Sequence, residues 1–404
     1  MSEAASQKSG WTTVAFGDVV KKVTDKVDPE ESGLERYIAG EHMDTDDLRI
    51  RRWGEIGDDY LGPAFHMRFK PGQVLYGSRR TYLRKVALAN FEGITANTTY
   101  VLESKDPEVL LPELLPFLMQ AETFHEHSKR ESKGSVNPYV NFSDLAWYEF
   151  ALPPLAEQRR IADALTCAEV LRERLRLCAT RSQELLRSSI MANVVELAGQ
   201  MIRVGDLVDR SVIASPQDGN HGEIHPKAAD YVTEGIPFLM ANDVRYGRVD
   251  LEECKFISEN QARSLRVGFA QAGDVLLTHK GTLGEAAILP QSDHPFVMLT
   301  PQVTYYRVED ETQLLARYLY FIFQSGAFYR QMLSRGRQST RLFVGITAQH
   351  ELEIPFPKIE IQARLVDQWS KFESSVQEFA ERRAAANAVS RSVRNSILMA
   401  EGEE

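Results

Sequence analysis

A run of basic residues without an acidic neighbour lies between residues 68 and 85. Its cations are Arg68, Lys70, Arg79, Arg80, Arg84 and Lys85. Lysine and arginine side chains bind phosphate groups, and arginine also binds the edge of guanine through two hydrogen bonds. A glycine, a short apolar run and a polar turn predict a hairpin with Arg79 and Arg80 at its tip. We interpret this hairpin as a nucleic-acid contact; the alternative is a solvated hairpin whose charges protect a sheet edge.

Two polar loops carry side chains of the same chemistry. The segment 127–138, HSKRESKGSVNP, contains Lys129, Arg130, Lys133 and Asn137. The segment 334–341, SRGRQSTR, contains Arg335, Arg337, Gln338 and Arg341, in a stretch from 312 to 350 that has no acidic residue. Asparagine and glutamine can bind adenine through two hydrogen bonds. We predict that both loops contact DNA; the alternative for each is a flexible surface loop.

A second turn, at residues 278–280, contains His279 and Lys280. It follows FAQAGDVLL, which has the same pattern of a glycine before an apolar run as FKPGQVLYG at residues 69–77. Lys280 is a candidate phosphate contact. His279 is either a base contact or an ordinary turn histidine.

Composition limits the class of protein. The net charge of −10 argues against nonspecific coating of nucleic acid, so the local distribution of arginines matters more than their total. The three cysteines form no CxxC pair, which predicts neither a zinc site nor a disulfide framework. No apolar run approaches the roughly 18 residues of a membrane span, and no secretory signal is visible, so we expect a cytoplasmic protein without a membrane partner.

The chain contains an internal repeat. Residues 134–163 align without gaps on residues 338–367 at a constant offset of 204, which pairs Val140 with Val344 and Gln158 with Gln362. VAFGDVV at 14–20 is similar to IRVGDLV at 202–208. A repeat of roughly 200 residues is too long for a solenoid and indicates a duplicated domain.

A long helix is predicted after each copy, at 156–199 and from 360 to 400. Positions 161, 168, 175, 182 and 189 and their partners 365, 372, 379, 386 and 393 give a heptad repeat, with Ala164, Leu171, Cys178 and Leu185 completing the first seam. Two such helices favour a coiled coil; the alternative is an amphipathic helix that packs on its own domain. The prolines of LPPLAEQRRIADAL (152–165) fix the chain where the first helix begins.

The expected fold is therefore mixed α/β, with a pseudo-two-fold internal repeat. We divide the chain into residues 1–152 as a first α/β domain, 153–200 as a central long helix, 201–356 as a second α/β domain and 357–404 as a C-terminal long helix.

These features resemble the DNA-specificity subunit of Type I restriction-modification enzymes. The resemblance rests on LPPLAEQRRIADAL, on FPKIEIQARLVDQW at 356–369 and on YIAGEHMD at 37–44, and it covers essentially the whole chain. The second corner departs from the first, because Lys358 replaces Pro154 and Ile361 replaces Glu157. How that corner packs is therefore open.

The resemblance implies a non-catalytic subunit that binds double-stranded DNA. Each α/β domain would be a target recognition domain that reads one half of a bipartite, asymmetric site. The helices would form an antiparallel coiled coil that separates the domains and docks two methyltransferase subunits, and restriction-motor subunits would join that core. S-adenosylmethionine, ATP and Mg²⁺ would be bound by those partners, with no cofactor in this chain.

Missing motifs weigh against enzymatic alternatives. The sequence has no Walker GxxxxGK[ST] motif, and VNPYV at 136–140 has one proline where an amino-methyltransferase motif has two. The alternatives that stay open are the specificity subunit of a related bipartite-site system, a self-contained methyltransferase or nuclease, and a scaffold that binds no DNA.

Overall fold

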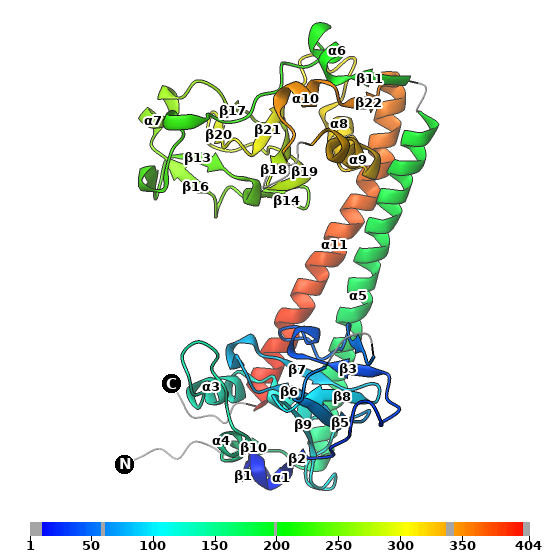
Figure 1. The fold of residues 1–404 in the computed structure, drawn as a ribbon, viewed down its shortest axis with the longest axis vertical. Helices are drawn as coiled ribbons and strands as arrows, with labels where there is room; N and C mark the ends of the chain where they lie inside the picture. Colours follow the sequence, from blue (N-terminus) through cyan, green and yellow to red (C-terminus); the bar gives the residue numbers. More distant parts are fainter. Residues whose placement is uncertain (1–9, 58–60, 198–199, 337–342, 399–404) are drawn as a thin grey trace. The chain divides into compact units, whose positions relative to one another are not determined.

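The computed structural model describes residues 10–57, 61–197, 200–336 and 343–398. The chain divides into two compact units, one formed by Met1–Arg176 with Glu381–Glu404 and the other by Leu177–Ala380. Each unit contains an α/β domain and parts of two long helices, α5 (Leu155–Glu196) and α11 (Ile359–Leu398) (Figure 1). The mixed α/β class with two long helices is thus confirmed.

The first domain has two four-stranded sheets and a separate two-stranded sheet. Their orders are β2-β9-β6-β7, β4-β3-β8-β5 and β1-β10. The strands are β1 (Thr12–Ala15), β2 (Val20–Val23), β3 (Arg36–Ile38), β4 (Gly54–Glu55), β5 (Phe65–Phe69), β6 (Val74–Gly77), β7 (Val86–Leu88), β8 (Gly93–Ala96), β9 (Thr99–Ser104) and β10 (Glu149–Leu152). The short helices are α1 (Phe16–Val19), α2 (Leu115–Met119), α3 (Glu122–Arg130) and α4 (Phe142–Ala146).

The second domain repeats this plan. Its sheets have the orders β12-β16-β13-β20-β17, β19-β18-β21, β14-β15 and β11-β22. The strands are β11 (Met201–Arg203), β12 (Tyr231–Val232), β13 (Ile236–Leu239), β14 (Val244–Arg245), β15 (Arg248–Val249), β16 (Lys255–Ile257), β17 (Phe269–Ala270), β18 (Val275–Lys280), β19 (Thr282–Ile288), β20 (Val297–Leu299), β21 (Val303–Tyr306) and β22 (Glu353–Pro355). The short helices are α6 (Val204–Asp209), α7 (Glu259–Ser264), α8 (Ala316–Phe323), α9 (Gly326–Arg335) and α10 (Ile346–His350).

The strand pairings show that the duplication is structural. In each domain one sheet contains a parallel pair, β3 with β8 and β13 with β20, between antiparallel neighbours. In the other sheet Val74 lies opposite Leu102, as Val275 lies opposite Tyr306. The apolar runs of FKPGQVLYG and FAQAGDVLL fall on β6 and β18 of these sheets.

A buried glutamine fastens the first domain to the start of α5. Gln158 is 1 % exposed. Its Oε1 accepts the N–H of Leu111 at 2.8 Å, and its Nε2 donates to the carbonyls of Val109 and Pro153, each at 2.8 Å. A buried amide without such partners would destabilise the folded state by roughly 1–3 kcal/mol. The amide therefore fixes where the helix begins relative to the domain.

The second domain has the same contact at an offset of 204. Gln362 Oε1 accepts the N–H of Leu315 at 3.1 Å, and its Nε2 donates to the carbonyls of Gln313 and Pro357 at 2.8 and 2.9 Å. The second corner packs like the first despite its changed sequence, since the Lys358 carbonyl accepts the N–H groups of residues 361 and 362 as the Pro154 carbonyl accepts those of 157 and 158. We call Gln158 and Gln362, with these partners, the glutamine clasps.

The two helices pack together within each unit. In the second unit Leu186 and Ile190 of α5 share an apolar core with Leu365 and Trp369 of α11, and Gln368 Nε2 donates to Ser189 Oγ at 3.2 Å. In the first unit Val393 of α11 packs against the core that contains Ile161 and Leu165 of α5. The start of each helix therefore lies beside the end of the other.

The predicted phase of the first seam is partly wrong. Leu171 and Leu185 are 51 % and 55 % exposed, and Cys178 is exposed too, whereas Leu165 and Leu186 are buried. The buried seam lies four residues after positions 161, 168, 175 and 182, where we predicted three. Both spacings are close to one helical turn, so the sequence pattern alone does not choose between them.

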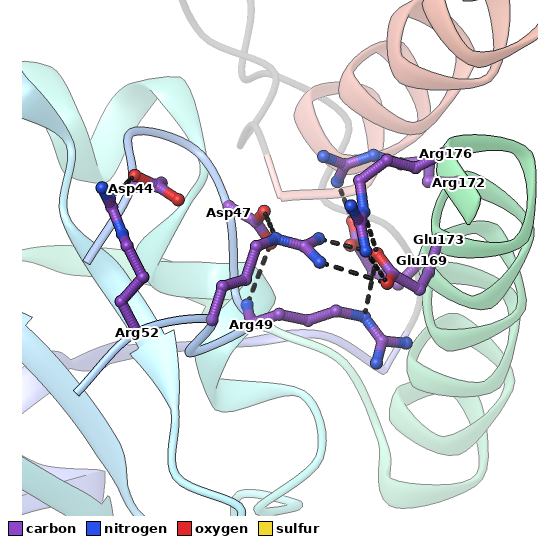
Figure 2. A network of polar contacts seen from close by, with 9 residues as sticks. Asp44, Asp47, Arg49, Arg52, Glu169, Arg172, Glu173 and Arg176 are labelled. Atoms are coloured by element: carbon purple, nitrogen blue, oxygen red, sulfur yellow. Dashed lines mark hydrogen bonds and ion pairs between the residues drawn. The ribbon is translucent and has the colours of Figure 1, made fainter. Parts of the chain in front are cut away.

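An ion network joins segment 44–52 of the first domain to α5 (Figure 2). Arg51 donates from Nη1 and Nη2 to the two carboxylate oxygens of Glu173 at 3.1 and 2.7 Å, and from Nε to Asp47 at 2.9 Å. Arg176, one turn further along α5, also donates two hydrogen bonds to Glu173. Hydrogen bonds from Arg176 and then Arg51 lower the pKa of Glu173 to about 2.

We predict that Glu173→Gln lowers the free energy of unfolding at pH 7 by about 1.5–3 kcal/mol, because it removes the acceptor charge from hydrogen bonds with two arginines. The folded pKa of about 2 lies below the ordinary value of 4.5, so this stabilisation is complete above pH 4.5 and is lost as the pH falls to about 2. Urea unfolding followed by circular dichroism at several pH values measures it.

Glu184→Gln is the matched control. Glu184 also lies on α5 and pairs with Arg181 at 2.8 Å, but both side chains are more than half exposed. This substitution should change the free energy of unfolding by less than about 0.5 kcal/mol. Equal losses in the two variants, or a Glu173→Gln loss that persists at pH 2, would contradict the prediction.

Candidate nucleic-acid interface

The structure brings together the basic turn and the following loop of the first domain. Arg79 and Lys133 each form a β-bridge with Tyr139. The N–H of Arg80 donates to the Pro138 carbonyl at 2.6 Å, and Arg80 Nε donates to Asn137 Oδ1 at 2.8 Å. Segments 50 residues apart in the sequence therefore form one surface, and we call residues 79, 80, 133, 137 and 139 the basic turn surface.

Backbone conformation explains why Arg80 projects from this turn. Arg80 has φ 52°, in the left-handed region that side chains other than glycine seldom occupy, and it precedes the 3₁₀ turn η2 (Thr81–Leu83). Lys280 bridges Phe343 in the second domain as Arg79 bridges Tyr139, so the residue equivalent to Arg80 is Gly281, with φ 85°. The first domain therefore tolerates about 1 kcal/mol of backbone strain to place an arginine there.

The remaining cations of the loop lie at the end of α3. Lys129 and Arg130 are exposed in its last turn. Arg130 pairs with Glu131 at 3.1 Å, and Lys133 Nζ pairs with Asp144 at 2.9 Å, which raises the pKa of Lys133 and lowers that of Asp144. Among the described residues Arg79 and Lys129 have no carboxylate partner, so their charges are available to an anionic ligand.

Four of the predicted contacts are engaged elsewhere. Arg84 is a structural residue, since it donates to Asp46 at 2.8 Å and to Glu122 at 2.7 Å. Lys85 donates to the Gly40 carbonyl, and Arg68 pairs with Glu92 at 2.6 Å. Arg68 and Lys70 precede β6, whereas Arg79 follows it, so they lie at opposite ends of that strand. These four residues lie apart from the basic turn surface, and their contact with DNA stays a prediction.

His279 is also placed differently from the prediction of a base contact. It is fully buried on β18, where Nδ1 lies 3.0 Å from the Val344 carbonyl. Burial lowers the pKa of His279 to about 4, so the ring is neutral at pH 7. Its position matches Ser78 of the first domain, because the carbonyls of both residues accept an N–H from Val344 and Val140 respectively. This placement favours an ordinary structural histidine over a base contact, although the residue lies at the end of a strand and not in a turn.

The remaining predicted contacts of the second domain are Lys280, at the end of β18, and Arg335, at the end of α9; both are partly exposed. Lys280 Nζ lies 5.7 Å from the centroid of the Phe343 ring. Arg337, Gln338 and Arg341 lie outside the described residues.

Sequence reasoning missed two aromatic side chains beside these cations. Tyr139 is exposed and bridges both Arg79 and Lys133, and Trp147 is exposed with its ring 5.9 Å from the Arg130 guanidinium. The repeat alignment could have identified Tyr139, because it pairs this residue with another aromatic residue, Phe343. In the structure Phe343 forms a β-bridge with Lys280, as Tyr139 does with Arg79. Trp147 has no such signal.

No group of three or more His, Cys, Asp or Glu side chains is arranged to hold a metal ion in the part of the chain that the structure describes. Within the same residues, no helix has the length and apolar character needed to cross a membrane.

The comparisons with known proteins agree with this architecture. Residues 8–184 match the family described as the Type I restriction modification DNA specificity domain. The chain is 25 % identical over 191 residues to the specificity subunit of the Type I restriction enzyme EcoDI from Escherichia coli, a match that spans 46 % of this chain and 42 % of that protein. It is 18 % identical over 414 residues to the MjaVIII specificity subunit from Methanocaldococcus jannaschii, which covers 96 % and 92 % of the two chains.

Two solved structures share the fold over nearly the whole chain. One is the S subunit of a Type I restriction-modification system from M. genitalium, with a TM-score of 0.57, 13 % identity and 97 % of each chain covered. The other belongs to a study of assembly of the type I R-M system, with a TM-score of 0.56, 20 % identity and 97 % and 98 % covered. Residues 8–184 are therefore similar to the Type I restriction modification DNA specificity domain, and the chain as a whole shares the fold of these two solved structures.

We predict that Arg79→Ala with Arg80→Gly weakens binding of the full chain to a mixed-sequence DNA duplex and lowers the slope of log K against log salt by about one to two units. Glycine at position 80 keeps the left-handed backbone, so the variant removes charge without new strain. Binding is measured by fluorescence anisotropy across a salt series. Lys70→Ala, an exposed cation at the other end of β6, is the control; an equal effect there, or no effect of the double variant, would contradict the assignment.

Proposed function

We propose that the chain is the non-catalytic DNA-recognition subunit of a Type I restriction-modification complex. Each α/β domain reads one half of a bipartite, asymmetric site in double-stranded DNA. The paired helices set the distance between the half-sites and dock two methyltransferase subunits, which restriction-motor subunits join. S-adenosylmethionine, ATP and Mg²⁺ act in those partners.

The observation that carries this proposal is the duplication of a complete reading unit. Each unit has a sheet with one parallel pair between antiparallel neighbours and the same glutamine clasp. Each also has a bridge from a cation at or just after the end of a strand to an aromatic residue ahead of the long helix, Arg79 with Tyr139 and Lys280 with Phe343. Two copies that differ in their surface side chains suit a target whose two halves differ in sequence. A single enzymatic active site would not require a second copy.

Electrostatics supports DNA as the ligand of the basic turn surface. The chain has a net charge of −10, so a nonspecific attraction to phosphate is weak, yet exposed cations gather around residues 79, 80 and 133. Phosphate contacts fix the position of a protein on the duplex, and amide and guanidinium groups beside them read base edges. Asn137, whose Oδ1 is oriented by Arg80, is the candidate base-reading amide of the first domain.

We predict that the purified chain transfers no methyl group from radiolabelled S-adenosylmethionine to DNA, whereas the chain together with its methyltransferase partner methylates a bipartite motif. The reason is that recognition and chemistry reside in different subunits. Methylome sequencing of cells that carry both subunits gives the motif, and the same cells without this chain are the control. Robust transfer by the purified chain alone, or an unchanged methylome without it, would contradict the proposal.

A further inference from the structure

The last described turns of α11 reach the first domain, within the first compact unit. Arg394 is 4 % exposed, and its Nη1 donates to Gln120 Oε1 at 2.7 Å. The next residue, Asn395, accepts through Oδ1 the N–H of Glu122 at 3.3 Å. Glu122 is the first residue of α3, where backbone N–H groups lack partners inside the helix. The tip of α11 therefore holds both Gln120 and the start of α3.

A continuous path of hydrogen bonds leads from Gln120 to the basic turn surface. The Gln120 carbonyl accepts Arg84 Nη2 at 3.1 Å, while Glu122 and Asp46 accept Nη1 and Nε of the same guanidinium. Arg84 closes the turn that follows Arg79 and Arg80, and its own φ of 49° lies in the left-handed region. Its side chain is thus fixed at three nitrogens, and the position of Gln120 helps to determine the position of the turn.

A second path runs through α3. Ser132, just after the helix, contacts Thr81 in the turn through its hydroxyl at 2.6 Å and also donates to the Ser128 carbonyl. Lys133, the next residue, belongs to the basic turn surface. The capping of α3 by Asn395 therefore bears on where the loop that carries Lys133 and Asn137 lies.

We propose that Arg394 and Asn395 are positioning residues for the DNA-contact surface of the first domain. They touch no DNA themselves; they act through Gln120, Arg84 and α3 to hold residues 79, 80, 133 and 137 in one arrangement. This inference rests on the proposed function for its consequence in DNA reading, although the coupling itself is a property of the free chain.

Among its described residues the second domain has no equivalent of this polar contact, so the effect should be specific to one half of the protein. At the offset of 204, Ile190 and Met191 of α5 correspond to Arg394 and Asn395, and Gln324 corresponds to Gln120. Ile190 is 1 % exposed in the apolar core of the second unit. A substitution at Arg394 should therefore change the first half-site and leave the second unaltered.

Hydrogen exchange of the full chain, without DNA, tests the coupling directly. The amides of Arg80, Leu83 and Arg84 all donate backbone hydrogen bonds, so their exchange reports how often the turn opens. Arg394→Met keeps the aliphatic stem and removes the donor. We expect exchange in residues 79–84 and 122–133 to accelerate about 10-fold, the effect of losing one charged hydrogen bond. Arg394→Lys, which retains a cationic donor, should recover at least part of the protection.

Asn395→Ala is a second, milder variant, because it removes only the acceptor for the Glu122 N–H; it should accelerate exchange in 122–133. Ile190→Val is the matched control in the second copy and should leave the exchange of 79–84 unchanged. Unaltered exchange in both Arg394→Met and Asn395→Ala would overturn the proposal. A uniform acceleration across the first unit with a lower unfolding midpoint would also overturn it, because that pattern indicates only a stability role.

The functional readout is the methylated motif made by each variant in the complete complex. Arg394→Met should relax base preference in one half of the motif, and Arg394→Lys should restore it. Relaxation of both halves, or of neither, would refute the positioning role. If the wild-type complex produces no bipartite motif, the proposed function fails, while the exchange experiment still decides whether α11 controls the turn.

Discussion

The fold depends on two buried amides that attach each α/β domain to its long helix. Gln158 and Gln362 are almost fully buried. Each accepts one hydrogen bond and donates two, and all three partners are main-chain groups of a preceding loop or of the proline corner. Loss of the amide would leave these buried main-chain groups without partners. Because the partners are main-chain atoms, the contact places few demands on the side chains of the domain. The domain can therefore vary in sequence while its attachment stays the same.

Burial and the nearness of carboxylates separate the structural arginines from those available to an anionic ligand. Arg51, Arg84 and Arg307 are bound to acidic side chains and hold segments of their domains together. Arg394 is buried without a direct carboxylate partner among the described residues and is held by an amide oxygen. Arg79 is exposed and free of carboxylates within the same part of the chain. An acidic protein thus keeps a small number of cations for an anionic ligand.

The sequence was informative wherever the repeat or a local pattern carried the signal. The offset of 204 aligned the two clasps and paired Tyr139 with Phe343, and the proline corners placed the starts of both long helices within one residue. The same patterns predicted the mixed α/β domains, the hairpin strands and the pairing of the two long helices. These features depend on neighbours within one turn or one strand, which is why a single sequence predicts them.

Features that depend on distant partners could not be predicted. Arg84 pairs with Asp46 and Glu122, each 38 residues away, and nothing local distinguishes it from Arg79. His279 looks like an exposed turn residue in the sequence, but its backbone hydrogen bonds with residues 302 and 344 enclose it. In α5 the second row of seam residues was predicted three residues after positions 161, 168, 175 and 182, but the buried residues lie four residues after them. A heptad pattern is compatible with either spacing. In each case tertiary contacts decide between locally equivalent arrangements.

The central claim, that the chain is two independently attached reading units, is tested most directly by a domain exchange. Residues 11–152 are replaced by the first domain of a relative with a different target, while Gln158 and the rest of α5 are kept, and the methylome of cells with the partner subunits is sequenced. The account predicts a motif in which one half is new and the other half is that of the original protein. The reason is that Gln158 forms its hydrogen bonds with main-chain groups, which any such domain supplies. A motif altered in both halves would contradict independent reading by the two units.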